Sequence, residues 1–510
     1  MPGLLPCAAI KIRRSRSTNM RAETLFLKIT PITPVHIGTG EVYEPASFYI
    51  DERVGELVHF DQGIFINMLS QKDLAELSRI CKKGTPASII ELMRFVDRRA
   101  KGMLLDGDRV PVSSAFTEHY NKTINMNLRD NRKVKNELAK FEIWRTSFDP
   151  HTWELYMPGS AIKGAIRTAV LNFKGHGVTE RFKESNASKR LQQKILQFSW
   201  NNTSTDPFRL IRVSDFISIP QMSKRFIYYA INRKKGNRRS ARSLHQIFET
   251  IDVGTEFFGK ISIEAQNSCV KSPLNAKTVI NALEYFYGGE NKRENKELDA
   301  LGIKGVHLGQ GIPIRIGRHS GAECVTVEGH RHIMIKGPGK LKHYKDHATT
   351  LWLASPSRIP KVNDALRPFG WCVIETISEA EWKDALGCWL EHRDNLAQLN
   401  HENACGQTQD SLVNGRIGRE ARETTAVECA TEISPEEARK QRLQEFERSL
   451  PASSKFPGEA SKIIDNIETI DDPILKQRAI QLVKARFKNQ IKKGRKKGKK
   501  WALYLTDSEG

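Results

Sequence analysis

Residues 309–329 read GQGIPIRIGRHSGAECVTVEG, which predicts a strand, a glycine-rich loop and a second strand. A similar arrangement lies near the start of the chain, where the strand TLFLKIT (24–30) is followed by HIGTG (36–40), a predicted glycine-rich turn. Pro31 and Pro34 prevent a helix from following that strand directly. One such segment in each half of the chain suggests a duplicated α/β unit.

The remaining patterns alternate between strands and helices. Because no long apolar run typical of parallel strands is present, the alternation favours split βαβ (ferredoxin-like) sheets over a doubly wound sheet. Strands are predicted at 47–50, 56–60, 141–148, 209–219, 225–231, 244–251 and 256–264, and helices at about 61–82, 86–101, 157–173 and 276–300, with 115–140 partly helical. The predicted fold class is therefore α+β, with two ferredoxin-like domains and a C-terminal helical appendage.

Changes in composition set the expected domain boundaries, and a length of 510 residues suits two or three domains. Because Met20 stands directly before the first strand, one hypothesis is that translation starts there and omits most of the basic arm that precedes it. We assign a basic N-terminal arm to 1–22, a first domain with a helical insertion to 23–220, a second domain to 221–391, a linker to 392–433, and a helical appendage with a basic tail to 434–510.

Positive charge is concentrated in three runs. The chain has 81 Lys and Arg residues against 59 Asp and Glu residues, a net charge of +22. Segments 484–500, 224–242 and 11–22 hold ten, eight and five basic residues and no acidic ones, and the rest of the chain is nearly neutral. Such runs are typical of nucleic-acid binding, with solvated tails as the alternative for the two terminal runs. The middle run begins with Lys224 and Arg225, which we select as candidate RNA contacts.

Several classes of protein are excluded or disfavoured. No apolar stretch approaches the ~20 residues of a membrane span, which excludes an integral membrane protein. Eight cysteines without a CxxC pair indicate reduced thiols and a cytoplasmic location. The pairs His330/His332 and His343/His347 lack further ligands at suitable spacing, so we expect no metal or other cofactor.

The segment MPGSAIKGAIRTAVLNF (157–173) is a candidate anion site. Ser160 is a suitable N-cap, and Lys163 and Arg167 share one helix face near the N-terminus. An ordinary amphipathic helix with exposed basic residues is the alternative.

The second glycine loop is a candidate clamp for an RNA backbone. Arg315 and Arg318 flank Gly317, and His319 and Ser320 follow, so three possible phosphate donors lie beside flexible backbone. A solvated loop is the alternative.

The sequence gives little support for an enzyme. His36, next to the first glycine turn, is a candidate general base for a metal-independent ribonuclease, but no partner is fixed by spacing. Asp215 in RVSDF is a single carboxylate and makes no dyad. The turn Gly38-Thr39-Gly40 lacks the ending of a Walker sequence, so nucleotide hydrolysis is unsupported.

Taken together, these segments resemble the RAMP superfamily of CRISPR-associated proteins. Order and length are most similar to the group that supplies the fifth Csm subunit of type III-A effector complexes, and the similarity covers about 24–377. The motifs that carry it are PVHIGTG, MPGSAIKGAIRTAVL, RVSDF, IPIRIGRHSGAECVTVEG and PFGWCVIE.

The resemblance implies a noncatalytic RNA-binding subunit with two RRM-like domains, acting in antiviral defence. It would cap the effector complex at the 3′ side of the guide RNA, pack on the repeated backbone subunit, and support guide maturation through recruited nucleases. Without an aromatic RNP signature, contacts to the RNA backbone are expected to dominate.

The alternative is a RAMP-type metal-independent endoribonuclease that processes precursor guide RNA with His36 or His319 as its base. The RNA-facing residues carried over by motif are His36, Gly38, Thr39, Gly40, Ser160, Lys163, Arg167, Arg315, Gly317, Arg318, His319 and Ser320.

Overall fold

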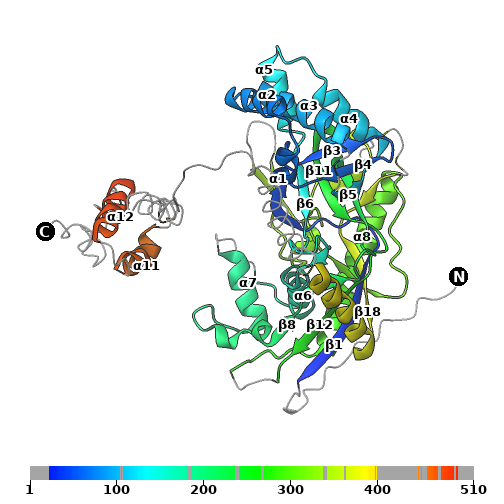
Figure 1. The fold of residues 1–510 in the computed structure, drawn as a ribbon. Coiled ribbons are helices and arrows are strands. Elements are labelled where there is room, and N and C mark those ends of the chain that lie inside the picture. The colour runs from blue at the N-terminus through cyan, green and yellow to red at the C-terminus, as the bar shows by residue number, and fades with distance from the viewer. Residues whose placement is uncertain are drawn as a thin grey trace. The chain divides into compact units, whose positions relative to one another are not determined.

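The computed structural model divides the chain into two compact units, 1–408 and 409–510 (Figure 1). The residues that the structure describes are 22–396 apart from 104, 106, 181–185, 236–239, 266–268, 337–341, 361–362 and 364, together with 398, 446, 450, 456–468, 473–487 and 490–491. The predicted N-terminal arm, nearly all of the linker and most of the basic tail lie outside these residues.

A seven-stranded sheet forms one part of the first unit. Its central strand, β1 (Glu23–Pro31), pairs antiparallel with β12 (Phe257–Ile263) on one side and with β18 (Trp371–Thr376) on the other. The remaining strands are β13 (Ile312–Arg315), β9 (Phe216–Ser218), β8 (Ile211–Val213) and β7 (Tyr156–Met157). Apolar residues repeat along β1, so that Leu27 and Ile29 face the core.

Two helices pack against each other beside this sheet, where α8 contacts β13 and β1 and α6 contacts β8. They are α6 (Gly159–Lys174) and α8 (Ala276–Ala300). On α6 the buried residues Ile162, Ile166 and Val170 recur every four positions and form one apolar face. The hydroxyl of Tyr287 on α8 donates to the carbonyl of Ala165 on α6 at 3.2 Å, which joins the two helices.

A six-stranded sheet forms the other part. Its spatial order is β17 (Arg367–Pro368), β16 (Thr350–Ser355), β10 (Arg225–Lys234), β11 (Ser240–Ile251), β6 (Ile143–Thr146) and β2 (Gly38–Val42). All neighbouring pairs are antiparallel except β11 and β6, which are parallel. The inner face carries Ile227, Tyr229 and Leu353, which join the same apolar core as Leu27 and Ile29 of β1.

A helical insertion covers a small sheet at one end of the unit, as Figure 1 shows. The sheet contains β3 (Phe48–Asp51), β4 (Glu56–His59) and β5 (Asp108–Pro111). The helices are α1 (Gln62–Asn67), α2 (Gln71–Lys82), α3 (Pro86–Met103), α4 (Ser114–Ile124) and α5 (Asn131–Leu138).

The other described elements are shorter. They are α7 (Ala187–Leu196), the 3-10 helices η1 (Thr203–Thr205), η2 (Pro207–Leu210) and η3 (Glu323–Val325), and the hairpin β14 (Ile333–Lys336) with β15 (Lys342–Lys345).

The second unit has an apolar core of its own. It contains α11 (Phe456–Glu468) and α12 (Pro473–Arg486), and the buried residues include Ile467, Val483 and Phe487. Both helices lie within residues 434–510, for which the sequence predicts a helical appendage. The predicted linker begins inside a helix that spans 379–396.

An α+β class is confirmed, but the arrangement of the strands differs from the prediction. Both large sheets combine strands from before and after residue 220, and the seven-stranded sheet has no parallel pair. Two separate ferredoxin-like domains are therefore not evident. Within the part of the chain that the structure describes, no helix is long and apolar enough to cross a membrane.

Two local predictions were wrong. The HIGTG segment was predicted to be a glycine-rich turn, yet residues 38–42 form the strand β2, because the edge of β6 offers hydrogen-bond partners. The second strand predicted within 309–329 is instead a loop with the single 3-10 turn η3.

Candidate nucleic-acid interface

The two glycine segments meet, although almost three hundred residues separate them. The backbone N–H of Arg318 donates to the carbonyl of His36 at 2.8 Å. Gly317 immediately precedes Arg318 and has φ +83°. A Cβ at this position would lie 2.5 Å from the His36 carbonyl oxygen. Only glycine combines this conformation with so close an approach. The segments predicted to face RNA are thus brought together by backbone contacts.

The second glycine loop, residues 316–321, lies on the outer face of the six-stranded sheet. The His319 ring stacks on Trp352 of β16, with 4.6 Å between ring centroids, and its Nε2 lies 3.2 Å from Gln246 Oε1 of β11. Beneath the loop, Ala230 and Ala354 stand opposite each other in register and are fully buried. These two small side chains leave room for the loop to lie close to the sheet.

Arg318 provides an exposed cation at this position. Its guanidinium carbon lies 5.6 Å from the ring centroid of Trp144 on β6 and 5.2 Å from that of Phe248 on β11. No carboxylate of the described residues forms an ion pair with it. An exposed guanidinium without an acidic partner is free to bind phosphate.

The first glycine segment forms the edge of the same sheet. Gly38, Thr39 and Gly40 are exposed on β2, which is the last strand in the order. Among the described strands, β2 pairs only with β6, where Val42 stands opposite Trp144. The edge of the β2 backbone that faces away from β6 has no strand partner among the described residues.

His36 supports this arrangement from below and does not face solvent. The ring is fully buried against Phe248, with 4.3 Å between centroids, and its Nδ1 donates to the Glu249 carbonyl at 2.8 Å. Burial, opposed by that hydrogen bond and helped by the charge of Arg318, lowers the pKa of His36 to about 4. The ring is neutral at pH 7 and cannot reach a ribose hydroxyl, so we leave His36 out of the interface.

Arg315 is also unavailable to RNA, because its side chain is only 1% exposed. The guanidinium pairs with Glu294 of α8 at 2.8 Å, donates to the Phe369 carbonyl at 2.9 Å, and lies 4.9 Å from the centroid of the Trp371 ring. Ser320 is buried too, and its hydroxyl donates to the Gly317 carbonyl at 2.6 Å. Both residues hold the loop in place.

The predicted anion site on α6 is occupied by the protein itself. The helix begins at Gly159, whose N–H donates to Asp215 Oδ1 at 2.7 Å, so Asp215 and not Ser160 caps it. Lys163 donates to the Ile211 carbonyl at 2.6 Å, and Arg167 pairs with Asp206 at 3.1 Å. Ser160 is exposed, but these contacts join α6 to its neighbours and not to either glycine segment.

In the middle basic run, Arg225 has a structural role. Arg225 is 9% exposed and pairs with Asp108 at 2.5 Å and with the buried Glu249 at 3.5 Å. Lys224 is exposed at the start of the same strand. Only Lys224 of these two predicted contacts is accessible to a ligand.

Sequence reasoning missed Trp144, Phe248 and Trp352 on the outer sheet face. The alternation of FEIWRTSF assigns Trp144 to the face opposite Ile143, and this signal was available. The positions of Trp352 and Phe248 next to the loop depend on strand pairing, which no local pattern reveals.

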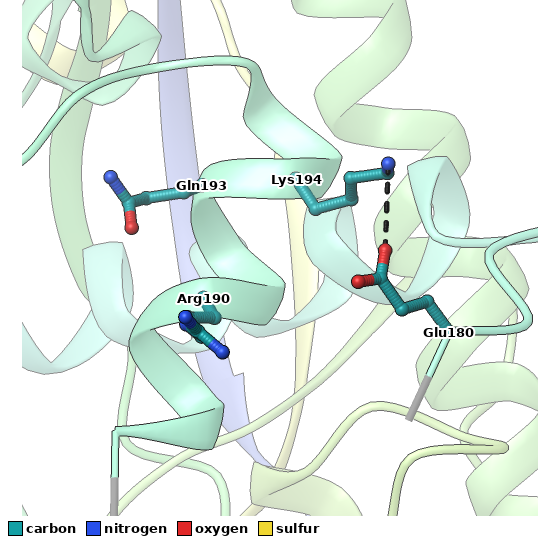
Figure 2. A pocket seen from close by; sticks show the side chains of 4 residues that line it. All are labelled: Glu180, Arg190, Gln193 and Lys194. Carbon is teal, nitrogen blue, oxygen red and sulfur yellow. Dashed lines mark ion pairs between the residues drawn. The ribbon is translucent and has the colours of Figure 1, made fainter. Parts of the chain in front are cut away.

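A shallow pocket elsewhere is lined by polar side chains. Figure 2 shows Lys194 of α7 paired with Glu180, with 3.5 Å between Nζ and Oε2, and Arg190 and Gln193 on the other side of the helix. None of its lining residues belongs to either glycine segment or to the six-stranded sheet, so we do not include this pocket in the interface.

Comparison with known proteins identifies the class to which this fold and surface belong. A family model described as the RAMP superfamily matches residues 28–318, and the chain belongs to that superfamily.

Two curated relatives share the name CRISPR system Cms protein Csm5. The Methanocaldococcus jannaschii protein is 26% identical over 207 residues, which cover 39% of this chain and 44% of the relative. The Streptococcus thermophilus protein is 26% identical over 162 residues, 29% of this chain and 38% of the relative. The chain thus matches less than half the length of these relatives.

Among solved structures, a chain of a type III-A Csm–crRNA–target RNA ternary complex has a TM-score of 0.44 and 16% identity, and the match covers 69% of this chain and all of that one. Csm5 of T. onnurineus has a TM-score of 0.40 and 15% identity, with 68% and 99% covered.

Proposed function

We propose that the chain is a noncatalytic RNA-binding subunit of a type III-A CRISPR (Csm) effector complex. The observation that carries the proposal is the junction of the two glycine segments, which joins the exposed Arg318 to His36, two residues before β2. Membership of the RAMP superfamily and the names of the two relatives support it.

The geometry suits an RNA backbone better than a small ligand. Arg318 supplies the charge for a phosphate, and Gly38 and Gly40 present backbone without side chains on an exposed strand. Thr39 is exposed between these two glycines, and Lys224 is exposed just before β10, so we include both in the proposed set. His319 instead positions the loop by stacking on Trp352. Ser160 is exposed on α6, and we do not include it in this set.

The proposal extends to the place of the subunit in the complex. The chain would bind the 3′ side of the guide RNA, pack on the repeated backbone subunit, and support guide maturation in the cytoplasm through recruited nucleases. Co-purification of the tagged chain with that backbone subunit and with guide RNA tests this part, and a chain that assembles without guide RNA would contradict it.

The geometry does not favour the endoribonuclease alternative. His36 is fully buried. Burial, together with the charges of Arg318 and His36, lowers the pKa of His319 to about 3, and its ring already stacks on Trp352. Neither histidine is placed to accept a proton from a ribose hydroxyl, because a general base must reach the proton that it removes.

Replacing Arg318 with Ala is expected to weaken RNA binding and to flatten its salt dependence. For single-stranded RNA, removing one cation that binds a phosphate lowers the slope of log affinity against log salt by ~0.7. Fluorescence anisotropy with a labelled guide RNA over a series of salt concentrations measures this slope. The matched control is Arg212→Ala, since Arg212 is an exposed arginine on β8 of the other sheet. Equal slopes for Arg318→Ala and the unchanged protein would contradict the proposal.

A further inference from the structure

The outer face of the six-stranded sheet carries a row of aromatic rings. In the strand register, Phe248 of β11 stands opposite Trp144 of β6 on one side and Tyr228 of β10 on the other. Phe226 lies two residues before Tyr228 on the same face, with 4.6 Å between their ring centroids. Four rings from three neighbouring strands therefore face the same way.

The central ring of this row is fully buried, and the outer rings are half-buried. Phe248 is fully buried beneath Arg318 and His319, whose side chains lie 5.2 Å and 5.3 Å from its centroid. Trp144 and Tyr228 are half-buried. Because strands in a sheet are spaced by roughly 4.8 Å, these two rings lie about 10 Å apart on either side of the covered Phe248.

The main apolar core occupies the opposite face of the sheet, where Ile143, Tyr229 and Ile247 are buried. A smaller buried cluster on the outer face includes Phe248, and Trp144 and Tyr228 pack against it while staying half-buried. An outward sheet face is usually polar, so accessible aromatic rings beside an exposed guanidinium indicate a ligand with flat apolar surfaces and negative charge. An unpaired nucleotide strand has both.

We propose that this face stacks unpaired nucleobases, one on Trp144 and another on Tyr228, while Arg318 holds a phosphate between them. The inference rests on the proposed RNA-binding function and adds the part of the RNA that is recognised. Every base has a flat aromatic face, so this binding is tolerant of sequence but requires single strands. The RNA is therefore held by its bases as well as by its backbone.

The test compares two ligands on the full chain: a fluorescein-labelled oligouridine and the same strand with abasic sites. Trp144→Leu is expected to lower affinity for oligouridine at least about fivefold, in line with the stacking energy of one base. Its salt slope is expected to stay unchanged, since the substitution removes no charge. Trp144→Phe keeps a ring and is expected to retain most of the affinity.

The matched control is Trp382→Leu, because Trp382 is half-buried against Phe26 and Lys260 at the seven-stranded sheet. For the abasic strand, the unchanged protein and Trp144→Leu are expected to bind with equal, weaker affinity. A variant that merely misfolds would also lose affinity for the abasic strand.

The failures of the two proposals are distinguishable. If the unchanged protein binds both strands equally, or if Trp144→Leu binds oligouridine normally, stacking is overturned while an effect of Arg318→Ala on the salt slope still supports RNA binding. If Trp144→Leu prevents assembly with the other subunits and leaves RNA affinity intact, the face binds protein, and the inference is overturned. If no RNA binds to the unchanged protein, the proposed function itself fails.

Discussion

Replacing Arg315 with Met is expected to lower the free energy of unfolding by roughly 3–5 kcal/mol, the cost typical of leaving one partner of a buried ion pair alone. The side chains of Arg315 and Glu294 are 1% and 2% exposed. Without the guanidinium, Glu294 keeps only the Trp371 indole N–H, at 2.7 Å, and its charge stays buried without a counterion. Urea denaturation followed by tryptophan fluorescence measures the decrease in stability.

The controls separate the effect of the buried charge from that of the missing side chain. Arg318→Met removes an exposed arginine from the same loop and is expected to change the stability by less than about 0.5 kcal/mol. The double variant Arg315→Met/Glu294→Gln is expected to be more stable than Arg315→Met, because the uncompensated charge is gone. Equal stabilities for Arg315→Met and Arg318→Met would contradict the structural role of Arg315.

Replacing Gly317 with Ala is expected to cost roughly 2–5 kcal/mol of stability and to weaken RNA binding as strongly as Arg318→Ala. Two effects combine: a left-handed backbone at φ +83°, and an overlap of the new methyl group with the His36 carbonyl oxygen, 2.5 Å from its ideal position. The overlap is relieved only if the two glycine segments move apart. This movement takes Arg318 away from Trp144. The denaturation and anisotropy experiments described above measure both consequences.

Gly309→Ala isolates the backbone strain. Gly309 has φ +64° and no atom within 4 Å of its ideal Cβ, so only about 1–2 kcal/mol is expected there. RNA binding that is normal in Gly317→Ala would show that the junction of the two segments does not position the interface.

Local patterns predicted the elements better than their arrangement. The apolar face of α6 and the long helix α8 follow from periodicity alone, and α8 begins and ends at the predicted residues. The strand β2 was not predicted, since its only partner, β6, begins a hundred residues later. The shared core of the two sheets was not predicted either, because strands of one half complete the sheet of the other.

In the candidate site, too, local sequence identifies the residue types but not which of them the fold leaves exposed. The sequence RIGR presents Arg315 and Arg318 as equivalent, and a count of charges treats them alike. In the structure Arg315 is buried and Arg318 is exposed, because Glu294, on a helix earlier in the chain, pairs with Arg315 and not with Arg318. In the same way Arg225 belongs to a basic run but is neutralised by Asp108 and Glu249. Burial of a charge depends on partners that only the fold brings close.

The position of the RNA is tested most directly by photocrosslinking. Guide RNA carrying 4-thiouridine near its 3′ end is bound to the full chain and irradiated, and the crosslinked peptides are identified by mass spectrometry. We expect crosslinks to peptides that contain residues 38–40, Trp144 and residues 318–319, the three parts of the proposed interface. Crosslinks confined to α6 or to the second unit would contradict the proposed RNA interface.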